Sequence, residues 1–276
     1  MSKRKWKLPA MSLLLFLVLL ADGALAGTVF AIARHQCGTF QSSTAQPSTI
    51  QASTIWSSTT PLSSVRPSIP QASTAQPRQV ALTFDDGPHQ TCTPALLDGL
   101  KQRGVKATFF LMGENIAGKE SLVQRMQEEG HLIGNHSYRH IQMTKEGAEQ
   151  ACAEIEQTET LIQDITGRRP EYLRPPYGAW NEQLECRVNL TTVLWNVDSL
   201  DWKDYGVDSI IKTVTGHKHL GSGSIILCHN GAKFTSEALD KLIQNLKDQG
   251  YTFVPLSELI YRDHYHLDHE GRQIKD

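Results

Sequence analysis

From residue 79 onward, short apolar runs alternate with longer stretches in which apolar residues recur at helical spacing. Runs of the first kind are typical of buried strands, and stretches of the second kind are typical of amphipathic helices. About seven alternations predict an α/β fold whose parallel sheet is flanked by helices, either open or closed into a barrel. The expected strands are 80–83, 107–111, 132–134, 172–173, 192–197, 224–227 and 252–254, and the expected helices are 93–103, 121–129, 144–166, 207–214, 236–249 and 256–260. Thr93 is the expected N-cap of the first helix, with Pro94 at its first position.

The first 37 residues predict export. A Lys/Arg-rich start precedes an apolar run from Leu8 to about Ala33, which places the N-terminus in the cytoplasm. The Ala24-Leu25-Ala26 stretch fits a signal-peptidase site, whereas the full length of the run suits an uncleaved membrane anchor. Both alternatives place the rest of the chain outside the cytoplasm, either secreted to the cell wall or anchored, with its N-terminal segment contacting the membrane.

Composition divides the remaining chain into three parts. Residues 38–77 are dominated by Ser, Thr, Gln, Ala and Pro and carry a single charge, so we expect a disordered linker. Residues 78–263 form the expected catalytic domain. Residues 264–276 form an expected polar C-terminal tail with three solvated histidines, because chain ends are often poorly ordered.

Charge and cysteine content limit the classes of partner. The first 77 residues hold six of the 27 Lys and Arg and one of the 29 Asp and Glu, which leaves residues 78–276 with a formal charge of −7. The absence of a basic run argues against a nucleic-acid ligand and leaves neutral substrates such as sugars. The five cysteines show no Cys-x-x-Cys spacing and predict no specific disulfide. We expect a monomer.

Two adjacent carboxylates follow the first expected strand, in Thr83-Phe84-Asp85-Asp86-Gly87-Pro88. The C-terminal ends of strands are where open α/β sheets and β/α barrels place their chemistry. Neighbouring anions repel one another, so the pair is costly unless a cation lies close to it. A solvated turn is the alternative for this stretch taken alone.

A second motif, His136-Ser137-Tyr138-Arg139-His140, follows the strand at 132–134. Two histidines four residues apart lie on one face of a helical turn, where both can bind one ion. With an aspartate from the first strand end they would form a two-histidine, one-carboxylate site that leaves positions open for water and substrate.

Three further stretches lie next to expected strands: Arg174-Pro175-Pro176-Tyr177-Gly178, Asp198-Ser199-Leu200-Asp201-Trp202 and Leu227-Cys228-His229. Each has a structural explanation by itself: a loop salt bridge for Arg174, a capping role for Asp198 and a core histidine for His229. Five such groups at the ends of strands favour a shared site instead.

These five motifs, in this order, resemble the polysaccharide deacetylase family, the family-four carbohydrate esterases, over about residues 79–260. The resemblance implies a distorted (β/α)7 barrel. Two features depart from the family pattern and bear on substrate fit. Asn230 stands where many members have Asp, and the segment 181–190 is short.

The resemblance also implies a role for each motif residue. Asp86, His136 and His140 would hold a divalent metal, with zinc expected and cobalt as the alternative. Asp85 would be the general base, oriented by Arg174, and His229 would be the general acid, held charged by Asp201. The Tyr177 backbone N–H would stabilise the oxyanion, and Trp202 and Leu227 would wall the acetyl pocket.

The implied reaction is the removal of N-acetyl groups from a cell-wall polysaccharide, with peptidoglycan N-acetylglucosamine as the main expectation. N-acetylmuramic acid, chitin-type oligomers and O-acetylated xylan are the alternative substrates. A non-catalytic sugar-binding relative is an alternative of another class, since intact motifs do not prove turnover. A non-haem iron oxygenase also uses two histidines and a carboxylate, but the spacing and the β/α alternation disfavour it.

Overall fold

Eight parallel strands build one curled sheet around the chain's central strand, β1 (Arg78–Gly87). The order along the sheet is β5-β4-β3-β2-β1-β7-β6, and β8 pairs with the start of β1. This arrangement confirms the expected distorted (β/α)7 barrel. The other strands are β2 (Thr108–Leu111), β3 (Leu132–Asn135), β4 (Tyr172–Leu173), β5 (Thr191–Thr192), β6 (Val197–Asp198), β7 (Ser224–His229) and β8 (Tyr251–Phe253).

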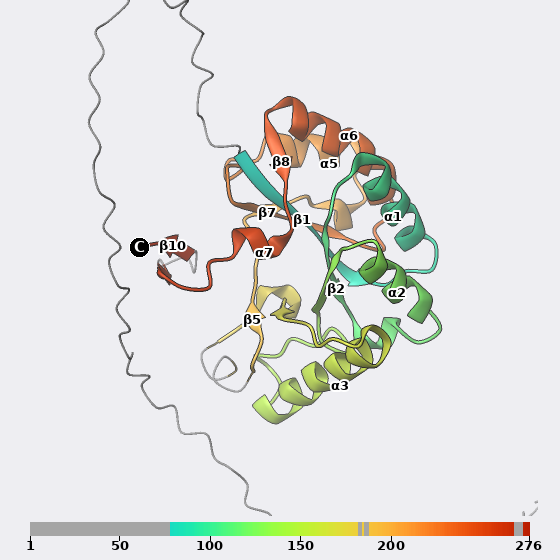
Figure 1. Ribbon diagram of the computed structural model, residues 1–276, viewed down its shortest axis with the longest axis vertical. Helices are drawn as coiled ribbons and strands as arrows, with labels where there is room; N and C mark the ends of the chain where they lie inside the picture. Colours follow the sequence, from blue (N-terminus) through green and yellow to red (C-terminus); the bar gives the residue numbers. More distant parts are fainter. Residues whose placement is uncertain (1–77, 182–183, 185–187, 268–272) are drawn as a thin grey trace, which may run out of the picture. The chain divides into compact units, whose positions relative to one another are not determined.

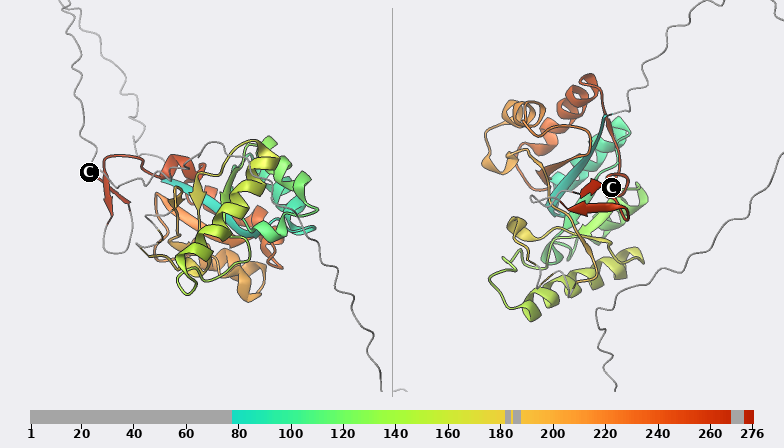
Figure 2. Two further views of the ribbon diagram at one scale, coloured as in Figure 1. Left: turned by 90° about the horizontal axis from the view of Figure 1, so that it is seen from below. Right: turned by 90° about the vertical axis from the view of Figure 1, so that its left-hand side faces the viewer.

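Helices surround the outside of this sheet, as the views of the computed structural model in Figures 1 and 2 show. Consecutive contacts run from α3 through α2, α1 and α6 to α5. The helices whose bounds the structure describes are α1 (Cys92–Arg103), α2 (Glu120–Glu128), α3 (Ala148–Thr166), α5 (Val207–Thr215), α6 (Thr235–Asp248) and α7 (Leu256–Leu259). Short 3-10 turns also lie in the described part of the chain: η1 (Gly113–Asn115), η2 (Pro176–Gly178) and η3 (Asp201–Lys203).

The structure describes residues 78–181, 184, 188–267 and 273–276. The expected signal or anchor segment and the linker lie outside these residues. Within them, no helix combines the length and the apolar character needed to cross a bilayer. Cys92, Cys152 and Cys228 are free thiols, and Cys228 is buried as expected for a small apolar residue.

The continuous apolar run that predicted the first strand reflects burial on both faces of the sheet. Val80, Leu82 and Phe84 are at most 1% exposed and belong to one core cluster with side chains of α1, β2 and α6. Phe84 stacks on Phe109 of the neighbouring strand, with ring centroids 5.2 Å apart. Ala81, on the opposite face of the strand, is 1% exposed and belongs to a second cluster, so the apolar start of this central strand is buried on both faces.

The prediction of one strand over 192–197 is wrong, because this segment crosses between the two edges of the sheet. Its start pairs with β4 as β5, and its end pairs with β7 as β6. The Val193 N–H donates to the Leu173 carbonyl (2.8 Å), and the Asn196 N–H donates to the Ile225 carbonyl (3.3 Å). The segment therefore closes the barrel, and we call residues 193–196 the seam.

Two predicted helix starts also differ from the structure. The helix expected from Thr144 begins at Ala148, after Gly147 in an extended conformation. The first helix begins at Cys92, and its N-cap position is Thr91. Thr93 is not the cap, because its hydroxyl accepts from the His89 N–H and donates to the Asn230 side chain.

The expected polar tail contains an antiparallel pair of short strands, β9 (Tyr265–Leu267) and β10 (Gln273–Lys275). The His266 ring pairs with the Asp276 carboxylate (2.8 Å), and both side chains are more than half exposed. This exposure agrees with the expectation of solvated histidines for the described part of the tail.

Substituting Gly134 with Ala should lower the free energy of unfolding by about 1–3 kcal/mol, the usual cost of overpacking. A Cβ there would meet Phe110 Cδ1 at 2.5 Å and the Tyr172 carbonyl at 3.2 Å, and Phe110 is fully buried. Urea unfolding measures the change. Gly147→Ala is the matched control, because nothing lies within 4 Å of its Cβ position. Equal stability of the two variants would contradict the packing described here.

Candidate active site and metal centre

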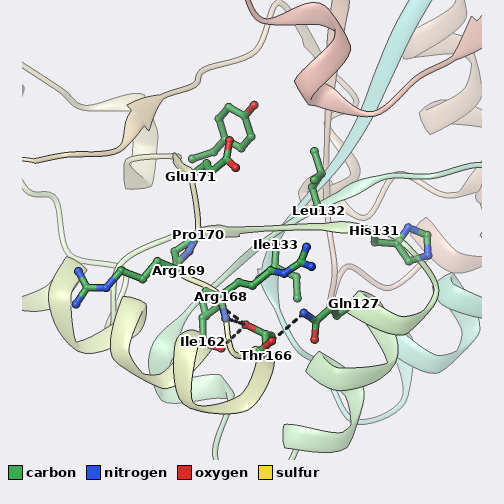
Figure 3. Close-up of a pocket in the computed structure, with 11 residues that line it drawn as sticks. Gln127, His131, Leu132, Ile133, Ile162, Thr166, Arg168, Arg169, Pro170 and Glu171 are labelled. Carbon is green, nitrogen blue, oxygen red and sulfur yellow. Dashed lines mark hydrogen bonds between the residues drawn. The ribbon is translucent and has the colours of Figure 1, made fainter. Parts of the chain in front are cut away.

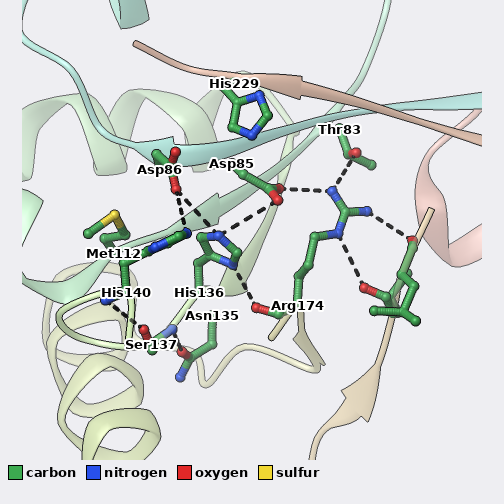
Figure 4. Close-up of polar contacts among 12 residues, drawn as sticks. Thr83, Asp85, Asp86, Met112, Asn135, His136, Ser137, His140, Arg174 and His229 are labelled. Atoms are coloured by element: carbon green, nitrogen blue, oxygen red, sulfur yellow. Dashed lines mark hydrogen bonds and ion pairs between the residues drawn. The ribbon is translucent and has the colours of Figure 1, made fainter. Parts of the chain in front are cut away.

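The C-terminal ends of four strands bring the predicted site residues to one rim of the barrel (Figure 4). Asp85 and Asp86 lie near the end of β1, and Asp85 is in register with His229 at the end of β7. His136 directly follows β3, and Arg174 directly follows β4. Five groups separated by up to 144 positions in the sequence thus converge, as expected for parallel strands that share a direction.

Asp86, His136 and His140 form a cluster whose ligand atoms all lie within 4.8 Å of one another. Asp86 Oδ1 lies 3.3 Å from His136 Nε2 and 3.5 Å from His140 Nε2. This oxygen is buried and accepts no hydrogen bond of ordinary geometry from the described residues. A buried carboxylate oxygen facing two imidazole nitrogens fits a divalent cation, which would satisfy all three atoms.

The protonation of these ligands also suits a cation. His136 Nδ1 lies 2.6 Å from the Arg174 carbonyl, which can only accept, so Nδ1 carries a proton and Nε2 is the ring nitrogen that faces the cluster. Burial, together with the neighbouring His136, lowers the pKa of His140 and favours its neutral form. Burial alone would raise the pKa of Asp86, but His136, His229 and His140 hold it below the ordinary value.

The expectation that a helical turn joins the two histidines is wrong. The chain from Ser137 to His140 is irregular, and both of these residues have positive φ, 64° and 57°. The His136 and His140 rings still meet, with centroids 5.0 Å apart. Their approach therefore depends on a loop conformation that the four-residue spacing does not require.

Asp85 is held by a guanidinium in the barrel interior. Arg174 is 0% exposed and Asp85 is 2% exposed, and Arg174 Nη1 donates to Asp85 Oδ1 over 2.8 Å. The second Asp85 oxygen lies 3.7 Å from His136 Nε2. Burial lowers the pKa of Arg174, and the charge of Asp85 opposes that shift. Asp85 Oδ1 is thus paired with the Arg174 guanidinium, while Oδ2 faces the candidate metal ligands.

His229 and Asp201 form a second charged pair, and His229 lies in register with Asp85 on the neighbouring strand. His229 Nδ1 lies 2.7 Å from Asp201 Oδ1, and the His229 backbone N–H donates to Oδ2 over 2.7 Å. Burial alone would lower the pKa of His229, but the Asp201 carboxylate, with Asp85 and Asp86, raises it to about 9. Burial alone would raise the pKa of Asp201, and its bonds from His229 and Thr235 lower it. His229 is therefore a proton donor at neutral pH.

Tyr177, Trp202 and Leu227 lie around these charged groups. The Tyr177 ring meets the His140 ring edge-on at 4.6 Å and is 67% exposed. Trp202 follows Asp201 in η3 and is 55% exposed, whereas Leu227 is buried in β7 two residues before His229. Tyr177 and Trp202 are thus open to a ligand at the rim, and Leu227 lies within the wall.

Several residues with positive φ gather at this rim. Asp86, Tyr177 and Leu200 have φ values of 67°, 61° and 56°, although none is glycine. Such conformations cost about 1–3 kcal/mol each and persist where surrounding contacts determine them, often at functional sites. Their clustering supports a preorganised site.

Three residues to which the sequence assigned no role hold backbone and side chains of the site in place. Asn115 Nδ2 donates to the Asp86 carbonyl (2.9 Å) and fixes that turn. Thr83 Oγ1 accepts from Arg174 (2.7 Å), and Thr235 Oγ1 donates to Asp201 Oδ2 (2.6 Å). Of these residues, only Thr83 could have been linked to the site from the sequence, because it opens the first motif. Asn115 and Thr235 sit in turns and helix starts, where such residues are ordinary.

Asn230, the departure from the family pattern, is fully buried and links two segments near the site. Its backbone N–H donates to the Asp85 carbonyl (2.8 Å), and its Oδ1 accepts from the Thr93 hydroxyl (2.5 Å). Its contacts within the described residues therefore join the end of β7 to β1 and α1.

A cavity of about 150 Å³ lies away from this site (Figure 3). It is lined by residues that precede or begin β3 and β4, among them His131, Leu132, Pro170 and Tyr172. These are the opposite ends of the strands from His136 and Arg174. The cavity therefore contains none of the residues predicted from the motifs.

Comparisons with known proteins agree with the geometry. The family model described as polysaccharide deacetylase matches residues 72–192. The chain is 41% identical over 198 residues to PgdA from Listeria monocytogenes, a peptidoglycan-N-acetylglucosamine deacetylase, covering 71% of this chain and 42% of that protein. It is 42% identical over 188 residues to a Bacillus cereus protein of the same description, covering 66% of this chain and 68% of that protein.

A third relative is PdaC from Bacillus subtilis, named a peptidoglycan-N-acetylmuramic acid deacetylase, at 38% identity over 194 residues. That alignment covers 70% of this chain and 41% of PdaC. The solved PdaC structure matches with a TM-score of 0.64 and 38% identity, covering 67% of this chain and 90% of that one. The chain thus spans about two fifths of the length of PgdA and of PdaC.

Replacing His136 with Ala should weaken Zn²⁺ or Co²⁺ binding by more than about 100-fold, since the loss of an outer-shell partner already costs 10–100-fold. Isothermal titration of the metal-stripped chain measures the change. His219→Ala is the control, because His219 is exposed and lies outside the cluster. Retention of a full equivalent of tightly bound metal by His136→Ala would rule out this ligand assignment.

Replacing Asp201 with Asn should lower the pKa of His229 from about 9, because the variant loses the largest contribution that opposes burial and keeps only those of Asp85 and Asp86. The His229 pKa is raised on folding, so the pair stabilises the native state fully below pH 6.5 and loses this contribution as pH rises through about 9. Histidine NMR titration gives the pKa, and unfolding at several pH values gives the linkage. An unshifted His229 titration in Asp201→Asn would contradict the pairing.

Proposed function

The chain belongs to the polysaccharide deacetylase family, and on that basis we propose that it hydrolyses N-acetyl groups of a cell-wall polysaccharide, with peptidoglycan N-acetylglucosamine as the substrate. One observation carries the proposal. An aspartate held by a buried arginine and a histidine held charged by a second aspartate lie at the same rim as a candidate two-histidine, one-carboxylate metal site. Such a site serves metal-assisted hydrolysis.

Asp86, His136 and His140 would hold the cation, and zinc suits their nitrogen and oxygen ligands, with cobalt as the alternative. Once bound, a divalent cation supplies a Lewis acid that polarises the amide carbonyl and acidifies a coordinated water. Asp85 accepts the proton of the attacking water. Its Oδ2 faces the metal ligands, while the bond from Arg174 to Oδ1 keeps the carboxylate oriented.

His229 completes the reaction as the proton donor. A bond forms between the water oxygen and the acetyl carbon, the carbon–nitrogen bond breaks, and the departing nitrogen takes a proton from His229. Asp201 orients His229 through Nδ1, which leaves Nε2 to donate. The Tyr177 backbone N–H is the proposed donor to the oxyanion. The products are acetate and a free amino sugar.

The choice of sugar rests on the relatives and on the export that the N-terminal sequence predicts. PgdA and the Bacillus cereus relative are named for N-acetylglucosamine, which favours that sugar. PdaC is named for N-acetylmuramic acid, which makes this sugar the second candidate. We propose that the chain acts as a monomer outside the cytoplasm, with the N-terminal segment at the membrane. Trp202 and Leu227 are the proposed walls of the acetyl pocket.

Acetate release tests the activity directly. The full-length chain would be stripped with a chelator, resupplied with zinc, cobalt or buffer, and incubated with N-acetylglucosamine oligomers, peptidoglycan and acetylated xylan. Mass spectrometry of digested peptidoglycan then assigns the lost acetyl group to glucosamine or to muramic acid. Metal-dependent release from glucosamine is the expected result. A metal-loaded chain that binds these polymers without releasing acetate would instead be a sugar-binding relative.

Asp85→Asn should retain metal and lower turnover by about 10²–10⁴-fold, the usual contribution of a general base. It should also lower the free energy of unfolding by about 3–5 kcal/mol, because the fully buried Arg174 loses its charge partner. Steady-state kinetics and urea unfolding measure the two effects. Asp240→Asn is the control, since its pair with Arg103 is at the surface. Full activity of Asp85→Asn would refute the role of base.

A further inference from the structure

The loop between the two histidine ligands carries a conformational cost that its own residues do not offset. Ser137 and His140 have φ values of 64° and 57°, a region that non-glycine residues avoid. None of the four residues from 137 to 140 lies in a helix or a strand. Contacts from elsewhere must therefore hold the loop in the form that aims both rings at Asp86.

Side chains, not backbone, satisfy the loop's N–H groups. The Ser137 N–H donates to Asn135 Oδ1 (2.8 Å), and the His140 N–H donates to Ser137 Oγ (2.9 Å). The two middle N–H groups, of Tyr138 and Arg139, both donate to Glu154 Oε2, over 3.1 and 2.7 Å. One carboxylate oxygen on α3 thus binds both N–H groups at the centre of the loop, while the Ser137 and Tyr138 carbonyls accept from backbone N–H groups of η1.

Glu154 is well suited to this task. It is 4% exposed, and its second oxygen accepts from Arg139 Nε (2.8 Å) and pairs with Arg139 Nη2 (2.7 Å). Its two oxygens therefore face four donors, which only a carboxylate can satisfy. The helix that carries Glu154, α3, is also fixed to the end of β3, because Asn135 Nδ2 donates to the Ile155 carbonyl (2.8 Å).

We infer that Glu154 is a positioning residue for the metal centre, which sets the geometry of His136 and His140 through the loop between them. The inference rests on the proposed metal site and concerns no contact between Glu154 and the metal or the substrate. The sequence offers no sign of it, because α3 carries several acidic residues on its polar positions.

Glu154→Gln is the first test. The amide has one oxygen that can accept and one N–H₂ group that can only donate. Its N–H₂ group would face either the two backbone N–H groups or the Arg139 guanidinium, and those donors would lose their acceptor. We expect Co²⁺ affinity of the metal-stripped full-length chain to fall about 10–100-fold, the range for outer-shell partners. The visible absorption spectrum of bound Co²⁺ should also change. Glu159→Gln is the matched control, since Glu159 lies on the same helix and contacts Arg169 instead.

A second substitution separates positioning from general support of the fold. Arg139→Met removes the guanidinium, whose side chain is 54% exposed, and leaves both N–H bonds in place, so Co²⁺ affinity should stay within about threefold. In Glu154→Gln combined with Arg139→Met, the amide N–H₂ no longer faces the guanidinium, and its carbonyl can accept from the loop. This double variant should regain most of the affinity.

Folded Glu154→Gln with wild-type Co²⁺ affinity and spectrum would overturn the inference, and so would a double variant no tighter than the single one. If Glu154→Gln does not fold, Glu154→Asp replaces it, because the shorter chain withdraws the carboxylate from the loop and should also weaken Co²⁺ binding. Unchanged affinity there overturns the inference equally. Metal titration needs no substrate, so a wild-type chain that binds Co²⁺ but releases no acetate refutes the proposed activity alone.

Discussion

The buried guanidinium of Arg174 is the constraint on which the rest of this structure depends. Its nitrogens donate to Thr83 Oγ1, Asp85 Oδ1 and the carbonyls of Val193 and Leu194. These partners come from β1 and from the seam that closes the barrel. An unpaired guanidinium inside a protein is strongly destabilising, so the closed barrel and the oriented Asp85 carboxylate are required together. The same guanidinium therefore both binds the seam that closes the barrel and orients the proposed base.

The backbone of the same residue extends this constraint to the metal centre. The Arg174 N–H donates to the Asn135 carbonyl (2.9 Å), and its carbonyl accepts from His136 Nδ1. Asn135 in turn supports the loop between the histidine ligands. The His229 and Asp201 pair is built separately, from β7 and η3. The Arg174–Asp85 pair and the His229–Asp201 pair therefore have different hydrogen-bond partners, although Asp85 and Asp86 also help to raise the pKa of His229.

The motif residues could be placed at one rim from the sequence, because the C-terminal ends of parallel strands lie at the same edge of the sheet. Each chemical group follows an apolar run, and the ends of such runs meet at one rim. The same reasoning failed for residues 192–197, where an apolar run crosses between two sheet edges and pairs with a different strand at each end. It also failed for His136 and His140, because spacing favours a helical turn and takes no account of side chains such as Glu154 that stabilise another conformation.

The sequence by itself determined the alternation of strands and helices, apart from the segment 192–197, and the chemical type of each site residue. These follow from local patterns of apolar and polar residues, which neighbours in the chain are enough to set. Only the tertiary structure decided the burial of Arg174, the raised pKa of His229 and the loop that joins the histidines. Each of these depends on the distance between groups far apart in the chain, and electrostatic and hydrogen-bond energies change steeply with that distance.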